Sequence, residues 1–183
     1  MNEQDLILVE VAKDLHSLQK YCGTDSVVTI PKSVFAIEKE AFRGNEHIEK
    51  VIIPITVKHI DELAFAECKN LKTIEIHCPT IIFKKNPFFN SASEFEIIFK
   101  GTKSDFEKAA EKVKIAVDEY QSGDYHHPTA THFEYYKTIT YSHIFSSDEY
   151  EPFTCTVKCS DGELVYHQMP YRTRLPHIRS VVS

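Results

Sequence analysis

Two stretches of the chain match each other, without a gap, at an offset of 23 residues. The first carries, in order, Val28-Thr29-Ile30-Pro31, Val34, Ile37, Ala41-Phe42, Asn45 and Ile48. The second carries Val51-Ile52-Ile53-Pro54, Val57, Ile60, Ala64-Phe65, Cys68 and Leu71. Self-similarity at a fixed period of this length is typical of a stacked repeat protein, in which each coil buries its apolar side chains only against neighbouring coils.

The residue types at the repeated positions fit such a coil. Val28 and Ile30 alternate inward on a short predicted strand, which leaves Thr29 between them pointing outward. Pro31 ends the strand pairing because proline has no N–H to donate. Asn45 and its counterpart Cys68 follow the Ala-Phe pair, where we expect a turn whose backbone groups they bind.

The repeat continues on both sides with less regularity. A third pass places Ile74, Ile76, Phe83 and Phe88 in the matching positions, with His77 in the proline position and Pro87 in the alanine position. A fourth pass contributes only a strand around Ile97 and Phe99, and residues 18–23 are consistent with a half coil that leads in. Terminal repeats are expected to be atypical because one side of each faces water.

The segments VVTIPKSVFAIEKEAF and VIIPITVKHIDELAFAECKNL resemble the BspA-like leucine-rich-repeat family, whose repeat reads roughly v-x-IP-x-x-V-x-x-I-x-x-x-AF-x-x-C-x-x-L. The glycine that commonly follows the Ile is Glu38 in the first repeat and Asp61 in the second. Residues 99–106 are similar to the "GTK" segment that often closes such arrays, and residues 157–162 to a C-terminal "V-x-C-T-D-G" strand.

The resemblance implies a β-rich α/β solenoid: a short, right-handed array of BspA-like leucine-rich repeats with helical caps and a C-terminal β-leaning extension. It also implies a non-enzymatic interaction protein, since many family members are surface-exposed adhesins. We divide the chain into residues 1–103, an N-terminal cap plus the solenoid, and residues 104–183, a helix and β-hairpin extension that packs on the solenoid end.

The flanking segments show mixed patterns. Ser104 and Glu107 are spaced as a capping box, and Phe106, Ala109, Ala110, Val113 and Val117 then form one apolar helical stripe. Residues 113–117 also alternate as a strand would. For residues 5–18 we expect a capping helix from Leu8, Val11, Ala12, Leu15 and Leu18, although residues 6–11 alone would also suit a strand. Asp161-Gly162 predicts a hairpin that pairs residues 155–160 with 163–166.

Composition limits the classes of function. A formal net charge of −6 disfavours nucleic acid as a partner, since that would require clustered Lys and Arg on one face. No window resembles a signal peptide or a membrane span, so we expect the sequence as written to be cytoplasmic, and secreted or at the cell surface if an upstream segment has been removed. We expect a monomer or a weak homo-oligomer.

Candidates for chemistry are sparse. The 5 cysteines suggest no disulfide framework. Cys155 and Cys159 would lie on one strand face about 13 Å apart, too far for a disulfide, so we expect buried, reduced thiols. His126, His127 and His132, with Asp124, could hold a metal, but their spacing matches no zinc motif. Cys159 with His143 or His167 could form a nucleophilic pair. We expect no enzyme and no cofactor; the alternative is a small enzyme or metal protein with its site in residues 121–167.

Binding of a protein partner is the function that the repeats favour, because a solenoid presents the outward positions of successive strands on one surface. Three apolar residues there, Ile52, Ile55 and Ile98, are expected to be exposed, which is typical of partner sites. The alternative is that the C-terminal unit covers them. The predicted binding surface comprises Thr29, Lys50, Ile52, Ile55, Thr73, Glu75 and Ile98.

Overall fold

The structure is a computed structural model that describes residues 3–84, 86–110 and 153–168 of the 183-residue chain. A 3-10 turn, Glu3–Asp5, opens the described part. The strands are β1 (Leu6–Ala12), β2 (Leu15–Tyr21), β3 (Val27–Thr29), β4 (Val34–Ile37), β5 (Lys50–Ile53), β6 (His59–Ile60), β7 (Thr73–Ile76), β8 (Ile82–Phe83), β9 (Glu94–Phe99), β10 (Phe153–Cys159) and β11 (Gly162–Gln168).

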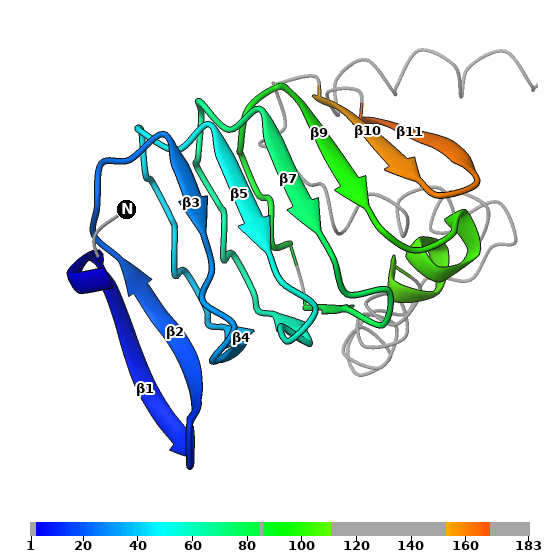
Figure 1. The fold of residues 1–183 in the computed structure, drawn as a ribbon. Helices are drawn as coiled ribbons and strands as arrows, with labels where there is room; N and C mark the ends of the chain where they lie inside the picture. Colours follow the sequence, from blue (N-terminus) through cyan, green and yellow to red (C-terminus); the bar gives the residue numbers. More distant parts are fainter. Residues whose placement is uncertain (1–2, 85, 111–152, 169–183) are drawn as a thin grey trace, which may run out of the picture.

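The repeats stack as coils, and each coil contributes one strand to each of two sheets (Figure 1). The longer sheet has the order β11-β10-β9-β7-β5-β3 and the shorter one β1-β2-β4-β6-β8. Pairing between coils is parallel, with Val28 beside Val51, Val51 beside Ile74, and Ile74 beside Ile97. The register therefore repeats the 23-residue offset of the sequence, and the predicted β-rich solenoid is confirmed.

The core runs along the stack between the two sheets. Phe42, Phe65 and Phe88 follow one another at 23-residue intervals, with ring centroids 4.8 Å apart for the first pair and 5.8 Å for the second. Tyr21 precedes them, 5.4 Å from Phe42. These phenylalanines are fully buried, so the aromatic column forms a continuous core that no single coil could form alone.

The turn after the repeated phenylalanine holds a polar residue that bonds the coil backbone, as predicted for Asn45 and Cys68. Asn45 accepts at Oδ1 from the N–H groups of His47 and Ile48, and its Nδ2 donates to the Gly23 carbonyl. The Cys68 thiol donates to the Phe42 carbonyl at 3.1 Å. Ser91, in the same position of the third coil, donates to the Phe65 carbonyl at 2.7 Å. The same bond thus recurs with thiol and hydroxyl donors.

The N-terminal cap is a β-hairpin, so the predicted capping helix over residues 5–18 is wrong. Strands β1 and β2 pair antiparallel, and Ala12 lies opposite Leu15 across a two-residue turn. Asp14 in that turn has a φ of 61°, a conformation that Asp tolerates better than most residues. Parallel pairing of β2 with β4 continues the shorter sheet, and this tertiary pairing overrides the helical spacing of the leucines.

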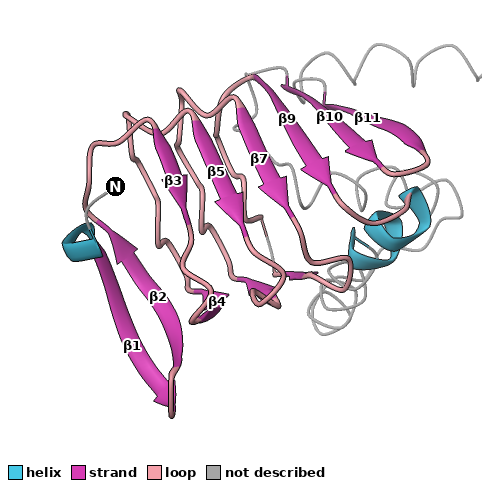
Figure 2. Cartoon of the chain, viewed as in Figure 1, coloured by secondary structure: helices cyan, strands magenta, loops and turns pink. Residues whose placement is uncertain are grey.

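The C-terminal cap begins with helical residues 103–110 (Figure 2). Its capping box is formed by Thr102 and Asp105, not by the predicted Ser104 and Glu107: the Asp105 N–H donates to Thr102 Oγ1, and the Thr102 N–H donates to Asp105 Oδ2. The Thr102 hydroxyl, which also donates to Asp105 Oδ2 at 2.7 Å, and the Thr102 N–H together lower the pKa of Asp105. Phe106, Ala109 and Ala110 are buried as the stripe predicted, whereas Val113 and Val117 lie outside the described residues.

The predicted hairpin forms between β10 and β11, but its two-residue turn is Ser160-Asp161 and not the predicted Asp161-Gly162, because Gly162 already pairs with Cys159 as the first residue of β11. Strand β10 also pairs in parallel with β9, with Val157 beside Ile97, so the hairpin continues the longer sheet past the last coil. Cys155 and Val157 are fully buried and continue the inward rows of Ile97 and its counterparts. The division of the chain at residues 103 and 104 stays a prediction.

Candidate protein-binding surface

The outward residues of the longer sheet align in two rows across the strands, and we call this surface the ladder face. One row comprises Thr29, Ile52, Glu75, Ile98 and Lys158 on β3, β5, β7, β9 and β10. The other comprises Val27, Lys50, Thr73, Glu96 and Thr156 on the same strands. Neighbouring strands in a sheet lie about 4.8 Å apart, so each row is a closely spaced line of side chains.

Six of the seven residues predicted from the sequence lie in these rows. Thr29 is exposed, and Lys50, Ile52, Thr73, Glu75 and Ile98 are half-buried. Ile52 and Ile98 are therefore less exposed than expected. Ile55 is 59% exposed but lies at the corner after β5, outside the rows.

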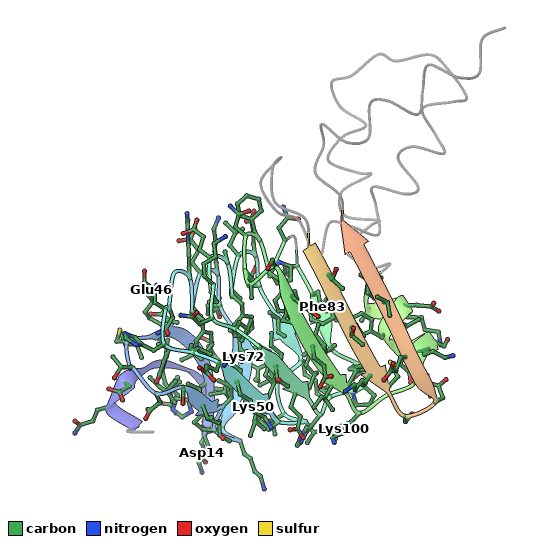
Figure 3. The ribbon with its side chains drawn as sticks, turned by 90° about the horizontal axis from the view of Figure 1, so that it is seen from above. Asp14, Glu46, Lys50, Lys72, Phe83 and Lys100 are labelled. Carbon is green, nitrogen blue, oxygen red and sulfur yellow. The ribbon has the colours of Figure 1, made fainter. Side chains whose placement is uncertain are left out.

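A cluster of ion pairs occupies the middle of the ladder face. Glu75 accepts from His77 Nε2 at 2.8 Å and pairs with Lys50 at 3.3 Å and with Lys100 at 3.5 Å. The two lysines, labelled in Figure 3, come from β5 and from the residue that follows β9. The Glu75 side chain is only 19% exposed. Hydrogen bonding to His77, together with the two lysines, lowers the pKa of this carboxyl group.

A second ion pair joins the last coil to the C-terminal hairpin. Lys158 on β10 pairs with Glu96 on β9, and this contact raises the pKa of Lys158. The sequence analysis did not identify Glu96 and Lys100. The repeat could have indicated both, because they lie 23 residues after Thr73 and His77. It could not have found Lys158, which lies beyond the repeats. Most charges on the ladder face are thus paired with each other.

The described part of the C-terminal unit does not lie over the ladder face. Strands β10 and β11 extend the edge of the longer sheet, in plane with β9 (Figure 1). The alternative that the C-terminal unit covers Ile52 and Ile98 concerns residues 111–152 and 169–183, which lie outside the described residues.

The thiols of Cys68, Cys155 and Cys159 are disfavoured as nucleophiles, whereas Cys78 Sγ accepts from the Lys58 ammonium group at 3.3 Å. Burial raises the pKa of the Cys68 thiol to about 12 and that of Cys155 well above its ordinary value. Cys159, one candidate for a Cys-His pair, has its pKa raised by burial and by Asp161, which disfavours the reactive thiolate. All five cysteines are unpaired, and Cys22 is exposed.

The metal candidates His126, His127 and His132, with Asp124, lie outside the described residues, as does His143; the side chain of His167 is also not described. Within residues 3–84, 86–110 and 153–168, no cluster of His, Cys, Asp and Glu side chains is arranged to hold a metal ion. Over the same ranges, no helix has the length and apolar character needed to cross a membrane.

The protein-family model described as "BspA type Leucine rich repeat region (6 copies)" matches residues 7–111. The match begins inside β1 and ends just past the described helical residues. It therefore contains the complete coils and the part of the ladder face between Val27 and Ile98. Neither the comparison with curated proteins nor that with solved structures gives a match.

Proposed function

Because the chain belongs to the family of BspA-type leucine-rich repeats, we propose that it binds a protein partner through the ladder face and catalyses no reaction. The family favours a repeat-based interaction or adhesin-like module. The observation that supports this surface most is the row Thr29, Ile52, Glu75 and Ile98, in which equivalent positions of four successive strands are presented side by side.

The chemistry of the surface suggests the kind of partner that it fits. Ile52 and Ile98 lie on either side of Glu75, whose charge is already balanced by Lys50, His77 and Lys100. A partner would gain most by placing apolar side chains over the two isoleucines, since burial of apolar surface dominates association. We expect long-range charge to contribute little to the association rate, because the main charges of the surface are paired.

The test compares capture of partners by the intact chain and by a chain that carries Ile52→Asp and Ile98→Asp. If the ladder face is the binding surface, the double variant should bind the captured partner at least about 30-fold more weakly, the effect of losing a typical interface hot spot. Circular dichroism and thermal unfolding of both chains would establish that the variant remains folded.

A matched control is Ile82→Asp. Ile82 is a half-buried isoleucine on β8, in the other sheet, so the same substitution places a charge on a different face. We expect it to leave capture unchanged. A photoreactive residue at Thr29 should cross-link the partner, and one at Ile82 should not. Loss of capture with Ile82→Asp but not with the double variant would contradict the proposal.

A further inference from the structure

The outer edge of β1 ends the shorter sheet, and no other described strand pairs with it. The strand is seven residues long and reads Leu-Ile-Leu-Val-Glu-Val-Ala, with Glu10 as its one charged residue. The hairpin extends beyond the first coil, at the N-terminal end of the stack (Figure 1). A long apolar edge strand of this kind is a template for pairing with another chain.

The side chains of β1 are exposed as well as its edge. Ile7, Val9 and Val11 occupy alternate positions along β1 and are 47%, 38% and 50% exposed, with Val11 at an irregularity in the pairing with β2 between Glu10 and Ala12. Caps of repeat proteins usually turn a polar surface to water, and unpaired edge strands are usually short or charged. At the two edges of the longer sheet, β3 has only three residues, and the seven-residue β11 includes the polar residues Glu163, His167 and Gln168. The apolar length of β1 therefore indicates a surface that is covered in the functional protein.

We propose that a second copy of this chain covers the edge, with β1 pairing antiparallel to β1 of the other copy about a two-fold axis at Val9. In this register Val9 lies opposite Val9 and Ile7 opposite Val11, so the exposed apolar stripe is complementary to itself. The two shorter sheets would join into one ten-stranded sheet, since each contributes five strands.

Charge complementarity favours this register. With Val9 on the axis, Glu10 lies opposite Leu8, and Asp5, the last residue of the 3-10 turn before β1, comes opposite Lys13, the first residue of the turn after β1 in the other copy. Moving the two-fold axis from Val9 to Glu10 would place Glu10 of one copy opposite Glu10 of the other, a like-charge contact that destabilises a sheet. Moving the axis from Val9 to Leu8 would place Asp5 opposite Val11, and both ion pairs between Asp5 and Lys13 would be lost.

The backbone of β1 is also compatible with this pairing. The Cys22 N–H donates to the Asp5 carbonyl at 2.8 Å, so the carbonyl group of Asp5 points toward the β2 side of the hairpin. Alternation along an antiparallel strand then turns the N–H and C=O groups of Leu6, Leu8 and Glu10 to the open edge. In the proposed register these residues meet Ala12, Glu10 and Leu8 of the second copy, which gives hydrogen-bonded pairs on both sides of the axis.

The first experiment measures the molar mass of the full chain in solution, by sedimentation equilibrium, from low micromolar to near-millimolar concentration. We expect a mass that rises toward twice that of the monomer. Val9→Lys should raise the dissociation constant of the dimer at least about 10-fold, because it sets two like charges opposite each other at the axis. The matched control is Ile55→Lys, which alters an equally apolar, exposed residue away from β1 and should leave the mass unchanged.

A charge exchange tests the register and remains informative if Val9→Lys disturbs folding. Asp5→Lys and Lys13→Asp should each weaken the dimer, whereas the double variant, which restores opposite charges in this register alone, should recover it. A monomeric mass at every concentration would overturn the proposal and leave another protein as the occupant of the edge. Weakening by Ile55→Lys but not by Val9→Lys would also overturn it. Because the ladder face lies on the other sheet, these outcomes are independent of partner capture.

Discussion

Glu75 lies at the centre of the candidate surface, and its surroundings connect stability with binding. Its carboxylate is mostly covered and is held by His77, the residue that follows β7, and by lysines from the coils on both sides. The cluster therefore links three successive strands through side chains as well as through the backbone ladder. It also fixes the side chains between Ile52 and Ile98, so that a partner would meet an ordered surface.

Removal of the Glu75 charge should destabilise the protein modestly and in a pH-dependent way. We expect Glu75→Gln to lower the free energy of unfolding at neutral pH by about 1 kcal/mol, the upper range for a partly exposed ion pair. The pKa of Glu75 is lowered in the folded state, so its contribution is complete above the unfolded value near 4.5 and disappears as the pH falls through the folded value. Urea unfolding of both chains between neutral and strongly acidic pH would measure this.

Glu49→Gln serves as the control for this prediction. Glu49 pairs with Lys72 at 2.9 Å, but the two side chains are 47% and 68% exposed, so the loss should be close to zero. A difference between wild type and Glu75→Gln that stays constant as the pH falls would contradict the role assigned to the carboxylate.

At the scale of the element, the turns of successive coils share a left-handed backbone conformation at equivalent positions, although the residues there differ in type. Positive φ angles occur at Glu40, Leu63 and Asn86, and again at Gly44, Glu67 and Asn90, each set spaced by 23 residues. The left-handed conformation costs a residue with a Cβ about 1–2 kcal/mol. In the second coil Glu67 adopts this conformation despite its Cβ, and its ion pair with Arg43 at 2.9 Å partly offsets the energetic cost.

Gly44 allows this cost to be measured by itself. Its φ is 69°, and a Cβ added there would meet no atom within 4 Å, so Gly44→Ala should be penalised for conformation alone. We expect a loss of about 1 kcal/mol in the free energy of unfolding. Gly44→Asn should lose less, because Asn tolerates this conformation and occupies the equivalent position as Asn90. Equal stability of Gly44→Ala and the wild type would contradict the explanation.

The sequence predicts what is periodic in this molecule and misses what depends on tertiary context. The inward positions, the aromatic column and the outward row at Thr29, Ile52, Glu75 and Ile98 all follow from the 23-residue offset. The left-handed turns do not, because Gly44 and Glu67 share a conformation without sharing chemistry. The N-terminal cap was mispredicted because its leucines fit both periods, and pairing with β4 decides between them. Lys158 joins the ladder face only through the pairing of β10 with β9.

For the whole molecule, stability depends on contacts between neighbouring coils and on the caps at both ends. The N-terminal hairpin continues the shorter sheet, whereas the C-terminal cap connects the two sheets. Phe106, in helical residues 103–110, is fully buried, and its ring lies 5.8 Å from that of Phe83 on β8 and 5.3 Å from that of Phe99 on β9. Tyr166 on β11 lies 6.0 Å away. One side chain thus joins the last coil, the cap and the hairpin.

Phe106→Ala should therefore destabilise the C-terminal end of the stack first. We expect a loss of about 3–5 kcal/mol, the usual cost of removing a buried phenylalanine. Because coupling in a stacked repeat acts between neighbours, amide hydrogen exchange should accelerate most in β9, β10 and β11 and least in β3 and β4. The control Phe35→Ala removes a half-buried ring that contacts His59 on the outside of the stack, and it should change exchange only slightly. Uniform acceleration of amide exchange along the chain would contradict this prediction. It would show that the coils unfold as one unit and that the C-terminal cap stabilises the N-terminal hairpin as much as the strands next to it.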